Sequence, residues 1–227
     1  MRRRIAHAHM LGGVTLIDPA STYIDADVRI GADTVVLPGT MLRGKTVIGE
    51  DCVIGPQAEI ADSVIGDGVA INRSVLSESS VGSHTQVGPF AYLRPGSKVG
   101  EHAKIGDFVE LKNAQIGDGS KVPHHSYVGD AVVGSRVNIG CGVITANYDG
   151  VNKHQTRIED DAFIGSNSSL IAPIHIGQGA YVVAGSTITS DVEADAMAIA
   201  RQRQTNKPGY ASRLKNRIRG KKPLSSE

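Results

Sequence analysis

The sequence is poor in aromatic residues and has no tryptophan: Phe, Trp and Tyr together make up 4% of its 227 residues. A hydrophobic core with so few large rings must be filled by closely stacked aliphatic side chains. Lys and Arg number 24 and Asp and Glu 23, so no net charge of one sign attracts nucleic acid or a membrane surface. No apolar run reaches the roughly 18 residues of a transmembrane helix, and no apolar segment of a signal peptide follows the basic start. We therefore expect a soluble, cytoplasmic protein without nucleic-acid or membrane partners.

Cysteine is scarce as well. Cys52 and Cys141 are the two cysteines, and they have neither metal-ligand nor redox spacing, which favours free thiols in a reducing compartment. A zinc site built from histidines would need three converging rings. The rings that the chain offers lack the paired spacing expected for such a site, and we expect no metal: His84, His102, His124 and His125.

What the sequence has instead is a period of six. Aliphatic residues recur at every sixth position over 24–60, 81–111 and 158–188, and glycine often follows them, as in "IGED", "VGEH" and "IGQG". A period of six fits neither a helix nor a heptad. It fits an even number of strand residues plus a turn, which returns the same side chain to the interior on each pass. The sequence therefore predicts an all-β parallel β-helix built from hexapeptide repeats over residues 14–200.

Three segments depart from the period. Residues 1–13 are expected to form a short helical segment. The polar segment 145–157, with the turn signal Asp149-Gly150, is expected to be a loop ejected from the solenoid, which is either a functional element or a solvated insertion. Residues 201–227 form a basic tail, with nine Lys and Arg and no acidic residue between positions 201 and 222. This tail is either solvated or binds a phosphate-rich ligand or nucleic acid.

Residues with chemical potential cluster around "KVPHHSYVGD" at 121–130. A histidine can act as a general base near neutral pH, and nearby Arg and Lys side chains suit a phosphate. Taken singly, each of these residues is as readily an ordinary surface residue. The candidates in this region are Arg94, Glu110, Lys112, His124, His125, Tyr127, Asn138 and Lys153.

Four segments resemble one family: "VGPFAYLRPGSKVG", "IGDFVELKNAQIGDGSKVPHHSYVGDA", "VNIGCGVITANYDGVNKHQT" and "AGSTIT". The family is the acetyltransferase half of the bifunctional bacterial enzyme that makes UDP-N-acetylglucosamine for peptidoglycan synthesis. The resemblance extends over nearly the whole chain, from "GVTLIDPASTYID" to "ARQRQTNKPGY". It implies a left-handed parallel β-helix that assembles as a homotrimer with sites between neighbouring subunits. The implied reaction is acetyl transfer from acetyl-CoA to glucosamine-1-phosphate without a metal.

The resemblance also implies a role for each matching residue. His124 would be the general base, and Glu110 would orient it or raise its basicity. The residues implied for the sugar phosphate are Arg94, Lys112, Tyr127, Asn138 and Lys153. The residues implied for acetyl-CoA are Asn147, Tyr148, Ser166, Ala184, Arg201, Lys207 and, through its backbone N–H, Cys141.

Two positions differ from the family pattern, which usually has an apolar residue in place of His125 and a small residue in place of Cys141. The Gly-rich nucleotide loop of the uridyltransferase half is not found in this sequence. Residues 1–13 are therefore interpreted as the remnant of the linker helix, and neither uridyltransferase activity nor a magnesium requirement is expected. Two alternatives remain at this point: an acyltransferase for another amino sugar or small amine, and a non-catalytic scaffold.

Overall fold

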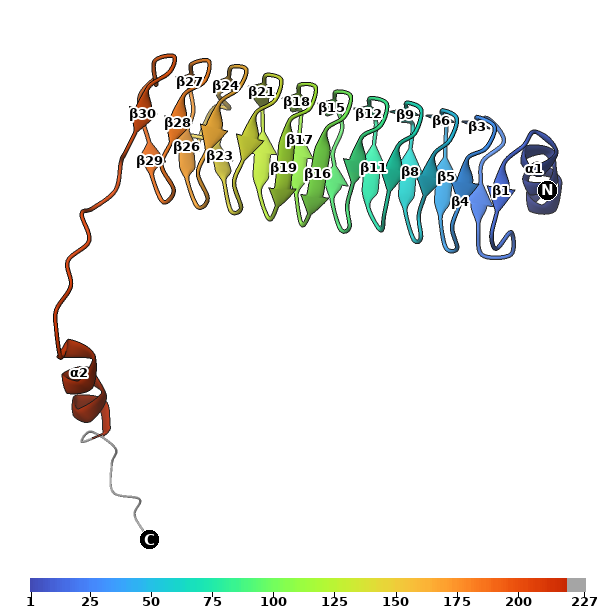
Figure 1. Ribbon diagram of the computed structural model, residues 1–227. Coiled ribbons are helices and arrows are strands. Elements are labelled where there is room, and N and C mark those ends of the chain that lie inside the picture. Colours follow the sequence, from blue (N-terminus) through green and yellow to red (C-terminus); the bar gives the residue numbers. More distant parts are fainter. Residues whose placement is uncertain (220–227) are drawn as a thin grey trace, which may run out of the picture.

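The body of the molecule is a solenoid of short parallel strands that form three sheets (Figure 1). The computed structural model describes residues 1–219. Except at the last coil, where β28 pairs with β30, each strand pairs with the strand three places further along the chain, so one coil contributes one strand to each sheet. Because every coil repeats the same path, residues of successive coils lie in straight lines parallel to the solenoid axis.

The first sheet has eleven strands: β1 (Thr15–Leu16), β4 (Val35–Val36), β7 (Val53–Ile54), β10 (Ala70–Ile71), β13 (Gln86–Val87), β16 (Lys104–Asp107), β19 (Lys121–His124), β22 (Asn138–Ile139), β25 (Phe163–Ile164), β28 (Tyr181–Val182) and β30 (Met197–Ala198). The second has ten: β2 (Tyr23–Ile24), β5 (Met41–Arg43), β8 (Glu59–Ala61), β11 (Val75–Ser77), β14 (Tyr92–Leu93), β17 (Glu110–Lys112), β20 (Tyr127–Gly129), β23 (Ile144–Ala146), β26 (Ser169–Ile171) and β29 (Thr187–Ile188). The third has nine: β3 (Arg29–Ile30), β6 (Val47–Ile48), β9 (Val64–Ile65), β12 (Ser80–Val81), β15 (Lys98–Val99), β18 (Gln115–Ile116), β21 (Ala131–Val133), β24 (Thr156–Ile158) and β27 (Ile174–Ile176).

The core is a set of aliphatic rows inside the solenoid. Leu93, Leu111 and Val128 follow one another in register on β14, β17 and β20, and all three are 0% exposed. Their neighbours along each strand point outward, because successive side chains of a strand face opposite sides. The six-residue period is therefore confirmed, and it explains why the core needs no tryptophan.

The segments outside the solenoid are two helices and one loop. Helix α1 (Arg2–Leu11) packs on the first coil through the buried Ala6. The loop 147–155 leaves the solenoid between β23 and β24. Helix α2 (Tyr210–Arg219) follows an extended segment that leads away from the solenoid (Figure 1). Residues 220–227 of the expected tail lie outside the described residues, and no helix within 1–219 is long and apolar enough to cross a membrane.

Candidate active site

The implied base and three of the positions implied for acetyl-CoA lie on one edge of the solenoid, where the first sheet turns into the second. The edge positions of five successive coils are Asp107, His124, Cys141, Ser166 and Ala184, which we call the edge column. Adjacent strands are about 4.8 Å apart, so the column extends over roughly 19 Å. The sequence-predicted base and three of the predicted acetyl-CoA positions thus follow one straight line.

The imidazole of His124 is hydrogen-bonded to a carboxylate of the preceding coil. Its Nδ1 lies 2.6 Å from Oδ1 of Asp107, and the two side chains are 55% and 40% exposed. This hydrogen bond to His124 holds the pKa of Asp107 below its usual value. Asp107 was not among the sequence-predicted site residues, although it precedes His124 by 17 residues, which is the length of one coil.

Unpaired backbone donors follow His124 along the edge column. Among residues 1–219, no acceptor is found for the N–H groups of Cys141, Ser166 and Ala184. The Cys141 side chain is an exposed free thiol. The next coil beyond His124 therefore presents a backbone donor where the resemblance implies that the thioester oxygen is held.

Three cationic side chains gather at the next edge, where the second sheet turns into the third. Lys112 donates to Asp130 at 3.0 Å, and this bond raises the pKa of Lys112. Lys153 has a lowered pKa, mainly because the Lys112 ammonium is beside it, and Arg94 adds to the repulsion. Clustered cations of this kind suit a phosphate, which would relieve their mutual repulsion. The structure thus brings together three of the residues predicted to bind the sugar phosphate.

Asp130 holds this cluster in place. Its carboxylate accepts hydrogen bonds from Lys112, Asn113 and Asn147, and its side chain is 15% exposed. These bonds lower the pKa of Asp130 against the opposing effect of its desolvation. Asp130 was not predicted from the sequence, yet it joins a predicted phosphate residue to a predicted acetyl-CoA residue.

Glu110 does not contact His124 in this chain. Its Oε1 accepts a hydrogen bond of 2.9 Å from Nη1 of Arg94, so the two side chains form an ion pair. On the adjacent strand β20, Glu110 is aligned with Tyr127. Glu110 and Tyr127 line an open hollow of about 410 Å³ on the second sheet. The carboxylate that contacts the candidate base is therefore that of Asp107, whereas the role implied for Glu110 stays a prediction. The other residues lining this hollow are Phe108, His125, Ser126, Gly142, Ile144 and Asn167.

His125 extends a row of aromatic rings beside the edge column. Phe90 and Phe108 stack with centroids 5.3 Å apart, and His125 meets Phe108 edge-on at 6.4 Å. All three residues have positive φ, as the turn at this edge requires, and the next coil has Gly142 at φ +73°. The row of rings therefore ends at His125. This gives His125 a packing partner that the sequence did not reveal.

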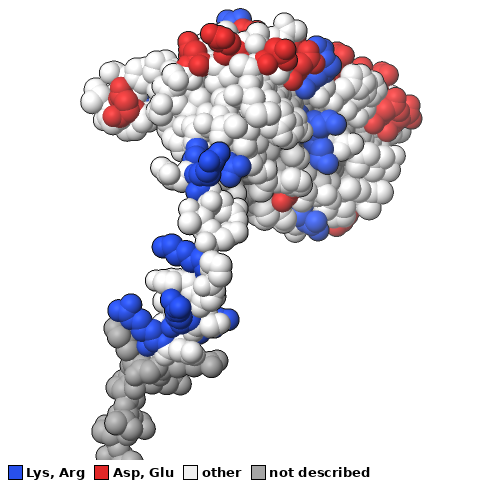
Figure 2. All heavy atoms as spheres, turned by 60° about the vertical axis from the view of Figure 1, so that its left-hand side comes forward, with Lys and Arg blue, Asp and Glu red and all other residues white. Residues whose placement is uncertain are grey.

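The remaining candidates are not brought to one place within the single chain. Asn138 belongs to the first sheet and Tyr127 to the second. Tyr148 lies in the loop and donates to the carbonyl of Gly150. Arg201 and Lys207 belong to the extended segment before α2, whose basic side chains are seen in Figure 2.

Internal bonds shape the loop that contains Lys153. Asp149 accepts from the N–H groups of Val151 and Asn152 and pairs with His154 at 2.7 Å. The bond to His154 and these two N–H groups lower the pKa of Asp149 to about 2. A bridge between Tyr148 and Lys153 makes the loop a small hairpin. The loop is thus a defined element that supplies Lys153 to the cation cluster.

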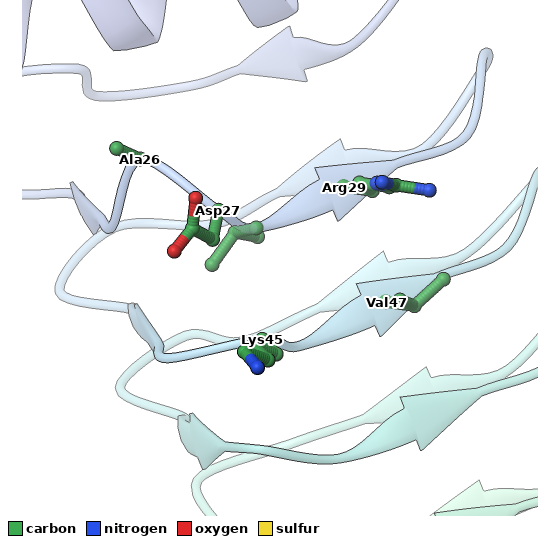
Figure 3. Close-up of a pocket in the computed structure, with 6 residues that line it drawn as sticks. Ala26, Asp27, Arg29, Lys45 and Val47 are labelled. Carbon is green, nitrogen blue, oxygen red and sulfur yellow. The ribbon is translucent and has the colours of Figure 1, made fainter.

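Another surface hollow, of about 490 Å³, lies elsewhere, near the first coils. It is lined by Asp27, Arg29 and Lys45, among others, and the basic side chains lie apart along β3 and next to β6 (Figure 3). No candidate residue borders it. Within residues 1–219, no group of three or more His, Cys, Asp and Glu side chains is arranged to hold a metal ion.

Two family models match the chain. "Bacterial transferase hexapeptide (six repeats)" matches residues 21–62 and 78–113, and "Hexapeptide repeat of succinyl-transferase" matches residues 155–190. With three sheets of parallel hexapeptide strands, the chain belongs to the hexapeptide-repeat transferases.

Within this class the chain is similar to one particular protein. It is 59% identical over 214 residues to the "Bifunctional protein GlmU" of Geobacillus sp., covering 94% of this chain and 47% of that relative. The protein of the same name from Brevibacillus brevis is 60% identical over 214 residues, covering 94% and 46%. The chain thus spans about half the length of the curated relatives it matches.

Solved structures support the fold. A UDP-N-acetylglucosamine acyltransferase from Francisella novicida has a TM-score of 0.58 at 17% identity, covering 80% of this chain and 66% of that one. The acyltransferase of the same name from Campylobacter jejuni has a TM-score of 0.58 at 16% identity, covering 88% and 82%. Together with the hexapeptide repeats, this likeness confirms the expected left-handed parallel β-helix.

Proposed function

We propose that this chain is an N-acetyltransferase that transfers the acetyl group of acetyl-CoA to the amine of glucosamine-1-phosphate. The observation that carries the proposal is the edge column, in which a histidine held by a carboxylate is followed by unpaired backbone donors. The similarity to bifunctional GlmU proteins over 94% of the chain supports the same reaction. The product, N-acetylglucosamine-1-phosphate, would serve UDP-N-acetylglucosamine and peptidoglycan synthesis.

The sugar phosphate would be held by the cation cluster. Arg94, Lys112 and Lys153 provide three positive charges, and the repulsion that lowers the pKa of Lys153 would be relieved by a phosphate dianion. Tyr127 lies on the same sheet and would contact the sugar. Asn138 belongs to another sheet, so its predicted contact would come from a neighbouring subunit of a homotrimer.

The chemistry requires a base and a donor to the developing oxyanion. Nε2 of His124 would take a proton from the substrate ammonium, and the free amine would attack the thioester carbon. The N–H of Cys141 would donate to the oxygen that becomes negative in the tetrahedral intermediate. The first proton, taken from the ammonium, would pass to solvent. As the C–S bond breaks, His124 would take the second proton from the newly bonded nitrogen and pass it to the departing thiolate of coenzyme A, which leaves a neutral amide. No acyl group passes through the Cys141 thiol in this scheme.

The N–H groups of Ser166 and Ala184 continue the edge column away from His124 and would contact the amide-containing arm of acetyl-CoA. Asn147 and Tyr148 would contribute from the loop. Arg201 and Lys207 would approach the phosphates of coenzyme A, because the tail that contains them is basic throughout.

The test is release of coenzyme A thiol from acetyl-CoA, with and without glucosamine-1-phosphate. His124→Ala is expected to lower the sugar-dependent rate by roughly 10²–10⁴-fold, the usual contribution of a general base. His125→Asn is the control, since asparagine tolerates the positive φ of that position. Absence of release from the wild-type protein would overturn the proposed reaction. Loss of activity only in His125→Asn would identify His125 instead of His124 as the base. A faster reaction with another amino sugar would show that glucosamine-1-phosphate is not the preferred acceptor.

A further inference from the structure

We propose that Asp107 is a positioning residue for the reaction: its carboxylate fixes the tautomer and orientation of His124, so that Nε2 is the atom that accepts the proton. This inference rests on the proposed function. It assigns to Asp107 the orienting role that the sequence resemblance implied for Glu110, and it follows from contacts between two adjacent coils.

The tautomer follows from the hydrogen-bonding capacity of the two side chains. Asp107 has a lowered pKa and is ionised near neutral pH, and an ionised carboxylate only accepts hydrogen bonds. The 2.6 Å contact therefore requires a proton on Nδ1 of His124. In the neutral imidazole the other nitrogen, Nε2, must then be unprotonated. No residue within 1–219 hydrogen-bonds Nε2, so its lone pair is available to a substrate ammonium.

The backbone holds the two partners at a fixed offset. Asp107 and His124 are aligned residues of the paired strands β16 and β19, and the N–H of His125 donates to the carbonyl of Asp107 at 2.8 Å. The backbone of neither residue can move along the solenoid axis without breaking this pairing. The carboxylate thus approaches the ring from the preceding coil, and the unpaired N–H of Cys141 belongs to the following coil. The imidazole lies between the group that orients it and the proposed oxyanion donor.

The same contact stabilises the charged ring during the reaction. When Nε2 takes the proton, His124 becomes an imidazolium beside the Asp107 carboxylate, while Asp107 stays ionised throughout. The other titratable groups near the pair are His125, one residue away, and Cys141 on the next coil. Neither of them makes a hydrogen bond to the imidazole. Glu110 is engaged by Arg94, so Asp107 is the carboxylate that acts on the ring.

Two substitutions separate orientation from charge. Asp107→Ala removes the acceptor, so the ring can rotate and both neutral tautomers become populated. We expect a fall in kcat of about tenfold or more, bounded by the 10²–10⁴-fold of a general base. Asp107→Asn keeps an acceptor oxygen of the same reach and removes the charge, and its loss should be smaller. The KM for glucosamine-1-phosphate should change little in either variant, because the cation cluster is untouched.

A control separates the role of Asp107 from the general effect of losing a surface carboxylate. The matched control is Asp161→Asn, which removes a carboxylate of similar exposure, 43%, that pairs with Arg136 on another edge. This control should keep the wild-type rate.

A structural readout is independent of turnover. With ¹⁵N-labelled histidine, the neutral imidazole of His124 in the wild-type protein should show a proton on Nδ1 and none on Nε2. Asp107→Ala should show a mixture of tautomers, while its thermal midpoint stays near that of Asp161→Asn. An unchanged tautomer and an unchanged kcat in Asp107→Ala would refute the positioning role. Absence of activity in the wild-type protein would instead refute the proposed reaction, and the tautomer measurement would still decide whether Asp107 orients the ring.

Discussion

Replacing Asp130 with asparagine should loosen the cation cluster and weaken substrate binding. The carboxylate accepts from Lys112 at 3.0 Å and from Asn113 at 2.8 Å, and it also holds Asn147. Breaking a fully buried ion pair costs about 3–5 kcal/mol, whereas an exposed pair contributes about 0.2–1 kcal/mol. The side chains of Lys112 and Asp130 are 19% and 15% exposed, between these limits. We therefore expect Asp130→Asn to lower the free energy of unfolding by about 1–3 kcal/mol.

The effect on function follows from the residues that Asp130 positions. Lys112 would lose the anion that holds its ammonium, and the loop would lose the anchor at Asn147. The KM for glucosamine-1-phosphate should rise more than kcat falls, because His124 and Asp107 belong to another edge of the solenoid. Denaturant unfolding and steady-state kinetics measure the two effects separately.

Asp62 provides the matched control for this prediction. Asp62 and Asp130 both have φ +46°, but Asp62 is exposed and accepts mainly from the backbone N–H of Lys45. Asparagine keeps an acceptor oxygen and tolerates this backbone conformation, so Asp62→Asn should change the stability by less than about 0.5 kcal/mol. Equal effects of the two substitutions on stability and on KM would refute the reasoning.

Three further predictions concern the core, the thiol and the loop. Leu111→Ala should lower the free energy of unfolding by about 2–5 kcal/mol in denaturant titrations, because the side chain is fully buried between Leu93 and Val128 of its row. Iodoacetamide should inactivate the wild-type protein by alkylating the exposed thiol of Cys141, and bound acetyl-CoA should protect against this inactivation. Cys141→Ala should retain activity and be insensitive to iodoacetamide, because the buried Cys52 should not react. The pKa of Asp149 is about 2 against its usual 3.8, so its contribution to closing the loop should be complete above pH 3.8 and disappear as the pH falls toward 2. Faster amide exchange in residues 147–155 at pH 3 than at pH 6, corrected for intrinsic rates, would verify this, and equal protection would contradict it.

The sequence predicts the solenoid well because each coil repeats the same physical requirement. An aliphatic side chain such as Leu111 must return to the interior on every pass, and this requirement appears directly as a period of six. The N-terminal helical segment, the ejected loop and the basic tail can also be recognised in the sequence, because the period of six is absent from them. Their boundaries depend on where strand pairing ends, and the loop in fact begins two residues later than expected, after β23.

The site was predicted less completely, because side-chain partners depend on the alignment of adjacent coils. Asp107 and Asp130 make the decisive contacts to His124 and Lys112, yet neither occurs in a pattern that sets it apart from other surface aspartates. The 17-residue offset between Asp107 and His124 is a usable signal only once the coil length at that point is known. The packing of His125 against Phe108 is another consequence of coil alignment.

A single solenoid leaves the proposed site incomplete, which leads to a prediction about assembly. Tyr127 and Asn138 belong to different sheets, and the tail that contains Lys207 leads away from both (Figure 1). A second subunit placed against the edge column would bring its own first sheet, with Asn138, to the site of the first subunit. If each site combines His124 of one subunit with Asn138 of its neighbour, two inactive variants should complement each other.

The experiment is co-expression of His124→Ala with Asn138→Ala. In randomly mixed trimers, about one quarter of the sites would have both native residues, so about one quarter of the wild-type activity should return. If both residues of a site came from the same subunit, mixing would restore nothing beyond the sum of the two variants. The matched control pairs His124→Ala with Asp107→Ala: the contact between these residues lies within one chain, so any site that retains His124 has lost Asp107. Recovery in the first mixture and not in the second would place the acetyl-transfer site between subunits.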